Sequence, residues 1–437
     1  MFSLALPVDR LPQAHPSSEM IEASQRNDDV DESEGLEEIQ AAAIGFLSLD
    51  RTTESNGLPF ILQAYATWLS HFTFEPLRII NLARNDTLRS YVSGEECRQI
   101  MNMMAENVHE VTRSAAYNPV QSSSFSMTQA MLQRRLIEAR TRIGTPGKPS
   151  HDSIRPLLTS PSKWISLMSK VGSLSSLLDF MQLVAPVFRR ACPDPLERLV
   201  NLPALFATLD VTLQYYSTAD VLLSVLTGRP MFFRYDVYFT PTVPESCFFL
   251  VDAPGARWAY GVPDRLVMTF AQMNALFEDF GPHVPTQVVD ELEQEIKSMK
   301  PIIAPSTEPI VVVGRMVVQE CWFLAALICL YMGLCGDNST DIRVANVRTR
   351  FMKLLVSVRP RRNPDSFLVL PMTILGVAVN DWEERDMIRR RMLGVSECTR
   401  PGRMGNDIVR ILDNVWSKRR PIVWSDLRQA CWEVAGV

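Results

Sequence analysis

Cysteine and histidine are the residues whose spacing could bind a metal, and the chain has eight cysteines and five histidines. Zinc requires thiolates or imidazoles held in close pairs, yet no CxxC, HExxH or HxxxH spacing occurs. The closest cysteines, Cys329 and Cys335, lie six residues apart in a helical pattern that turns them to different faces. The sequence therefore predicts reduced cysteines, with no metal-binding or cofactor-binding residue in this chain.

The acidic run DDVDE at residues 28–32 is the sharpest candidate for catalysis. It fits the DDxx(D/E) element with which helical terpene cyclases hold magnesium and diphosphate. Those carboxylates must line an apolar cavity, whereas residues 28–32 lie in a hydrophilic segment and no second metal-binding element follows. No P-loop, GxSxG or GxGxxG motif occurs either. We expect no catalytic residues and no enzyme; the alternative is a helical enzyme or small-molecule-binding protein with an apolar cavity.

Three basic clusters lie in the last third of the chain. The run RRR at 389–391 ends a predicted helix, where arginines compensate the helix dipole, although contact with nucleic acid is the alternative. The other two clusters fall in predicted loops and form a candidate nuclear import signal: Arg359, Arg361, Arg362, Lys418, Arg419 and Arg420. The net charge of −5 does not favour non-specific DNA binding, so we expect DNA to be reached only indirectly.

Residues 321–336, CWFLAALICLYMGLCG, contain no charged side chain. A membrane-spanning helix needs about 20 apolar residues, and this run of sixteen is bounded by Glu320 and Asp337. A helix that is apolar on all sides and ends at a Gly–Asp–Asn turn is typical of the centre of a large helical domain. We therefore expect a soluble protein with this helix at its core and no contact with a membrane. The 20 methionines are expected to fill the core, the alternative being a methionine-lined effector pocket.

The elements around this helix predict an all-α fold, a large helical bundle or array. Apolar residues recur at helical spacing over 58–84 and over 162–191, where one stripe runs from Trp164 to Val184, and further helices follow to the end of the chain. Gly228 and Pro230 end one helix, while Pro371 predicts a kink or restart in another. Residues 229–262 are aromatic and punctuated by proline, which predicts a short irregular segment.

The remaining segments predict the domain organisation. Residues 19–38 carry nine acidic side chains against one arginine, so we expect 1–40 to be a disordered acidic tail. This tail could serve as an interaction segment or as a solvating leader. Residues 41–437 are predicted to form one helical domain, with a mobile Ser/Pro/Gly-rich insert around 113–160 that contains one basic helix.

Several long stretches resemble a known family. The sequence from ALICLYMGLCG to VWSDLRQAC closely resembles the C-terminal part of the fungal-specific transcription factor regulatory domain, in the second of its common types. VLTGRPMFFRYD at 225–236, YGVPDRLVMTFAQMNAL at 260–276 and residues 50–78 also resemble it, so the similarity covers roughly 45–435. The resemblance implies an all-helical domain, nuclear location and regulation of RNA polymerase II transcription.

In complete members this domain follows a binuclear zinc cluster that reads DNA and needs six cysteines. Here only acidic residues precede the domain and no cysteine occurs before Cys97. Zinc is therefore expected only in the missing N-terminal module, and this sequence is either a truncated gene model or a domain-only protein. The implied partners are the transcription machinery or a DNA-binding partner protein, together with a small-molecule effector.

Overall fold

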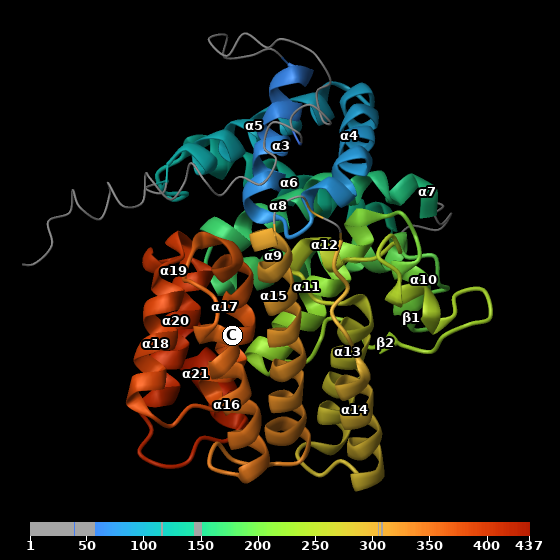
Figure 1. Ribbon diagram of the computed structural model, residues 1–437. Helices are drawn as coiled ribbons and strands as arrows, with labels where there is room; N and C mark the ends of the chain where they lie inside the picture. Colours follow the sequence, from blue (N-terminus) through green and yellow to red (C-terminus); the bar gives the residue numbers. More distant parts are fainter. Residues whose placement is uncertain (1–38, 40–56, 115–116, 144–150, 305, 307–308) are drawn as a thin grey trace, which may run out of the picture. The chain divides into compact units, whose positions relative to one another are not determined.

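The computed structural model describes residues 39, 57–114, 117–143, 151–304, 306 and 309–437. The all-α prediction is confirmed: among these residues the strands are β1 (Val200–Asn201) and β2 (Tyr235–Asp236), which pair in parallel. The DDVDE run and, apart from Ile39, the predicted acidic tail lie outside the described residues. Figure 1 shows the helices, whose bounds are α3 Leu58–Phe72, α4 Pro76–Val92, α5 Glu95–Arg113, α6 Ser123–Ile143, α7 His151–Ile154, α8 Pro156–Val171, α9 Leu174–Ala191, α10 Leu202–Phe206, α11 Val211–Thr227, α12 Arg257–Tyr260, α13 Asp264–Phe280, α14 Thr286–Ser298, α15 Pro309–Ile328, α16 Ile342–Val356, α17 Arg362–Val377, α18 Trp382–Leu393, α19 Ser396–Thr399, α20 Met404–Trp416 and α21 Ser425–Ala435.

The apolar run at 321–336 forms the end of the longest helical stretch. The helix α15 continues without interruption into a π-helix at Cys329–Leu334, so the whole element is 26 residues long. This length and its composition would suffice to cross a membrane, which corrects the expectation that the run is too short. However, 94% of its most apolar window is buried inside the protein, which supports its prediction as a core helix.

Helices from both sides of the sequence cover α15. It packs against α13 and α14, which precede it, and against α16 and α17, which follow it. In Figure 1, α15 lies between α13 and α17. The chain then leaves the core helix at Gly336, whose φ of 75° is the left-handed conformation predicted for this turn.

The segment around 113–160 differs from the predicted insert. Its residues 123–143 form α6, which packs against α5 and α9 and contributes buried side chains to the main core. Leu132, Leu136 and Ala139 lie on one helix face at spacings of four and three residues, and each is at most 4% exposed. The arginines that made this segment look polar lie elsewhere on the helix, with Arg134 exposed. The described part of the segment is therefore part of the core.

The apolar stripe from Trp164 to Val184 is buried as predicted but belongs to two helices. Helix α8 ends at Val171 because Gly172 is extended, and Ser173 begins α9 by accepting a hydrogen bond from the Ser176 N–H at 3.2 Å. Glycine and serine at adjacent positions thus break a hydrophobic period that otherwise continues.

Other predicted boundaries are observed in the described residues. Helix α11 ends at Gly228, which has a φ of 63°, and residues 229–262 contain only short elements: β2, a 3₁₀ turn at Glu245–Phe249 and α12. The restart predicted at Pro371 is wrong, because α17 runs through this residue to Val377 with helical backbone angles.

Candidate functional site

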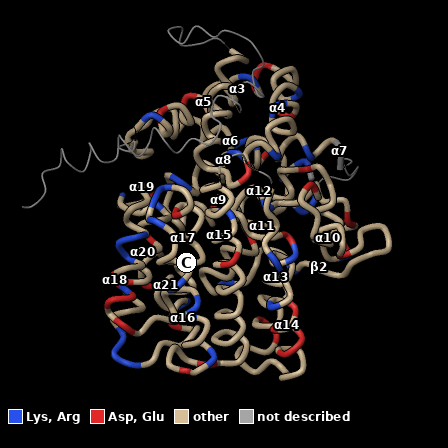
Figure 2. Tube along the Cα trace, viewed as in Figure 1, with Lys and Arg blue, Asp and Glu red and all other residues tan. Residues whose placement is uncertain are grey.

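The run RRR at the end of α18 is neutralised by acidic partners. Arg389 contacts Asp413 on α20 at 3.1 Å, Arg390 contacts Asp386 on α18 itself at 2.8 Å, and Arg391 contacts the buried Asp365 on α17 at 2.7 Å. Figure 2 shows acidic and basic residues interspersed around α18 and α20. Each charge therefore has a role within the fold, which counts against the nucleic-acid alternative.

The six residues of the predicted import signal fall into two groups. Arg362 binds Glu397 at 2.9 Å, while Lys418 and Arg420 both bind the buried carboxylate of Asp426 at 3.3 and 2.6 Å. The other three are exposed and have no side-chain partner among the described residues: Arg359, Arg361 and Arg419. Spacing along the chain could not separate these groups, because their acidic partners are distant in sequence or follow in the next helix.

The cysteines do not form a metal-binding group in the described part of the chain. All eight cysteines are free, and no group of three or more His, Cys, Asp or Glu side chains is arranged to hold a metal. Burial raises the pKa of the Cys321 and Cys329 thiols well above the usual value, so neither is a reactive thiolate.

A cavity of about 110 Å³ lies where the N-terminal helices meet α8, and it is the best candidate for a functional site. Residues from α3, α4, α5, α8, α11 and α12 line it. Its apolar walls include Leu62, Leu69, Ile79, Ile80, Met104 and Val108. Met104 is the one methionine among the lining residues, so the cavity does not match the predicted methionine-lined pocket.

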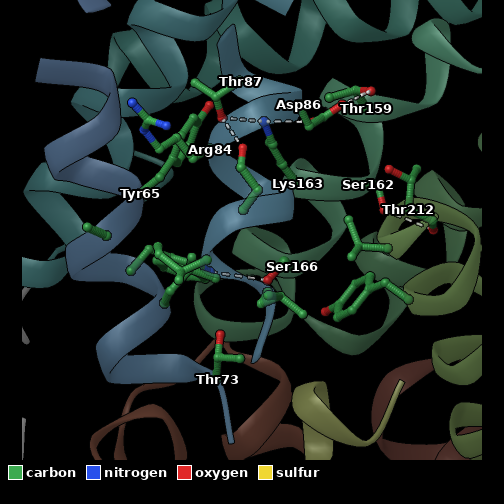
Figure 3. Close-up of a pocket in the computed structure, with 18 of the residues that line it drawn as sticks. Tyr65, Thr73, Arg84, Asp86, Thr87, Thr159, Ser162, Lys163, Ser166 and Thr212 are labelled. Carbon is green, nitrogen blue, oxygen red and sulfur yellow. Dashed lines mark hydrogen bonds and ion pairs between the residues drawn. The ribbon is translucent and has the colours of Figure 1, made fainter. Parts of the chain in front are cut away.

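A charged cluster stands at one side of this cavity. The Nζ of Lys163 on α8 lies 3.4 Å from an Asp86 carboxylate oxygen and donates to the Thr87 hydroxyl at 3.3 Å, both on α4. The same ammonium lies 4.7 Å from the centre of the Tyr65 ring on α3, close enough for a cation–π contact. Figure 3 shows Lys163 joined to Asp86 and Thr87 by dashed lines. Lys163 thus connects three helices around the cavity.

Two hydrogen-bond donors of the cavity lack partners. Among the described residues, the Tyr65 hydroxyl and the Nε of Arg84 are buried without one. A buried donor without a partner costs about 1–3 kcal/mol, which is tolerated when water or a ligand satisfies it. Burial, together with the nearby Asp86 carboxylate, raises the pKa of Tyr65 well above its usual value, so this hydroxyl stays protonated. It can therefore donate a hydrogen bond to an incoming group.

The charge of the cluster favours an anion over acid–base catalysis. Burial lowers the pKa of Lys163, although Asp86 acts against this shift. Among the described residues that line the cavity, Asp86 is the one carboxylate and none is a histidine or cysteine, so these residues lack the paired acid and base of a hydrolytic site. Lys163 and Arg84 outnumber Asp86 by one positive charge.

Tyr65 lies in the stretch whose helical spacing predicts a buried face, but no sequence motif identifies Arg84, Asp86 or Lys163 as site residues. The available signal was a lysine inside the apolar pattern of α8, one residue before Trp164, which is fully buried. A charge at the edge of a buried face needs a partner. The partners of Lys163 are Asp86 and Thr87, which lie on a helix about 75 residues earlier in the chain.

Comparison with family models shows that the fungal specific transcription factor domain matches residues 36–435. No curated protein and no solved structure is similar enough to match it.

Proposed function

Because the chain belongs to the fungal specific transcription factor domain family, we propose that it is a regulatory helical domain that controls RNA polymerase II transcription through partner contacts. The family supports a role in transcription regulation and, in general, a location in the nucleus. The partner would be the transcription machinery or a DNA-binding protein, and DNA would be reached only through that partner. The domain would act by binding and without catalysis.

The observation that carries this proposal is the cavity at the junction of α3, α4 and α8. Across this junction the indole N–H of Trp68 on α3 donates to the Ser166 hydroxyl on α8 at 3.3 Å, and Lys163 reaches α4. An effector in the cavity would favour one arrangement of α3 and α4 against α8. A ligand that binds one of two arrangements more tightly shifts their populations, and so changes which surface meets a partner.

The test of regulation is a tethering assay. The full chain is fused to a heterologous DNA-binding module, and transcription of a reporter that carries the matching operator is measured in a fungal cell. We expect a change in reporter expression of at least severalfold relative to the DNA-binding module alone. Equal expression in the two strains would contradict the proposal.

Nuclear import is proposed to depend on the exposed, unpartnered members of the basic clusters: Arg359, Arg361 and Arg419. Import receptors bind accessible basic side chains, whereas Arg362, Lys418 and Arg420 are held by carboxylates of the same chain. The triple variant R359A/R361A/R419A, fused to a fluorescent protein, should move from the nucleus to the cytoplasm. Arg390→Ala is the control, because this side chain is 74% exposed but lies in a helix outside the two clusters.

A further inference from the structure

We infer that the cavity at the α3–α4–α8 junction binds a small organic monoanion, such as a carboxylic acid with an apolar body, through Lys163, Tyr65 and Arg84. The inference rests on the proposed function only for the regulatory consequence of binding. The binding itself follows from the size, walls and charge of the cavity.

The size of the cavity sets the size of the ligand. One water needs about 10–15 Å³ of such a volume, so 110 Å³ corresponds to roughly seven to eleven waters, or a ligand of about eight to thirteen non-hydrogen atoms. This is the size of a medium-chain fatty acid or an arylacetic acid, and it is too small for a sterol or a nucleotide.

The walls and the donors determine the chemistry of that ligand. Side chains such as Leu62, Ile79 and Val108 are at most 7% exposed and offer an apolar surface to the body of the ligand. The Tyr65 hydroxyl and Arg84 Nε are buried donors without acceptors, so an acceptor group gains hydrogen bonds that the empty cavity does not make. Lys163 uses its hydrogens toward Asp86 and Thr87, which leaves one of its three ammonium hydrogens for the ligand.

The charge count selects a monoanion. Two cations and one carboxylate line the cavity, giving a formal excess of one positive charge. One negative charge on the ligand compensates this excess, whereas a dianion such as a phosphate monoester would leave a net negative charge beside Asp86. A neutral ligand of the same shape would leave the excess charge uncompensated in an apolar site.

The experiment is isothermal titration calorimetry of the full chain with four acids and their primary amides: hexanoate, octanoate, phenylacetate and indole-3-acetate. Each amide has the shape of its acid but no charge. We expect at least one acid to bind at least tenfold more tightly than its amide. Equal affinity of every acid and its amide would overturn the inference that the cavity selects an anion. No binding of any acid would also overturn it and would indicate a cavity filled by water only.

Matched variants locate the binding site. Lys163→Met should weaken binding of the acid at least tenfold. The control is Lys170→Met on the same helix, because this lysine is also half-buried and lies over an aromatic ring, 5.6 Å from Phe72, but does not line the cavity. An equal loss in both lysine variants, or no loss in Lys163→Met, would overturn the assignment.

A second variant avoids dependence on the folding of Lys163→Met. Tyr65→Phe removes only the unpartnered hydroxyl, so it should weaken acid binding about three- to tenfold while the melting temperature of the unliganded protein stays the same or rises. Unchanged acid affinity in Tyr65→Phe would count against the role of this hydroxyl. Calorimetry needs no partner protein, so failure of binding is distinguishable from failure of the tethering assay.

Discussion

The strongest stability prediction concerns Arg391, the last arginine of the RRR run. Its Nε lies 2.9 and 3.0 Å from the two carboxylate oxygens of Asp365, its Nη2 lies 2.7 Å from one of them, and Nη1 donates to the carbonyl of Leu355. The two side chains are only 5% and 3% exposed. Arg391→Met would therefore leave a buried carboxylate and a carbonyl without their donor.

The expected magnitude follows from this burial. Removing one partner of a buried ion pair costs about 3–5 kcal/mol, whereas an exposed pair contributes about 0–1 kcal/mol. Arg389→Met is the matched control, because Arg389 lies two residues before Arg391 in the same helix and pairs with Asp413 on α20. The side chains of Arg389 and Asp413 are 46% and 40% exposed. The double variant R391M/D365L removes both charges and should recover most of the stability that Arg391→Met loses.

The assay is urea unfolding at pH 7, followed by tryptophan fluorescence and circular dichroism. If the two probes give coincident transitions, the free energy of unfolding can be compared between variants. We expect a large fall in the midpoint for Arg391→Met and a small one for Arg389→Met. Equal midpoints for these two variants would refute the reasoning that burial makes the difference.

Three further predictions concern acid sensitivity, backbone conformation and metal content. Burial acts to raise the pKa of Glu397, but Arg362 and Lys170 outweigh it and lower that pKa from 4.5 to about 2. The folded protein therefore holds this proton less tightly than the unfolded chain, and roughly 3 kcal/mol of stability should be lost as the pH falls from about 4.5 to 2. Unfolding at a series of pH values should show that Glu397→Gln loses less stability with falling pH than the unaltered protein. An identical dependence on pH in the two proteins would argue against the role of Arg362 and Lys170 beside Glu397. Gly255 has a φ of 139° and an added Cβ would collide with a buried carboxylate at the start of α13, so Gly255→Ala should cost at least about 3 kcal/mol. Gly402→Ala, at a φ of 80° in open space, should cost only about 1–2 kcal/mol in the same urea assay, and equal costs would contradict the steric explanation. The purified chain should contain less than about one equivalent of zinc by elemental analysis and give no sequence-specific DNA shift at moderate salt; a tight shift would overturn the expectation that DNA is reached indirectly.

The features predicted from the sequence are those that depend on local pattern. The periodic apolar residues of α3, the left-handed glycine after α11 and the burial of the 321–336 run were all predicted, because a helix face and a cap are set by neighbouring residues. The family resemblance was also confirmed, over residues 36–435.

The features that were missed depend on contacts distant in sequence. Asp407 lies in the first turn of α20, yet its carboxylate accepts a hydrogen bond from the N–H of Leu174 at 3.0 Å and so serves the start of α9. The cavity cluster is likewise made by Lys163 and two residues of α4. Local periodicity carries no information about which distant helix supplies a partner, so neither contact could be predicted from spacing.

The burial of α15 has a consequence for synthesis of the protein. This 26-residue element is synthesised before α16 and α17, although both cover it in the finished fold. Until residue 377 has been made, the nascent chain carries a segment apolar enough to enter a lipid bilayer or to bind a chaperone. A truncation between α15 and α17 leaves that segment without the cover of α17 for the lifetime of the product.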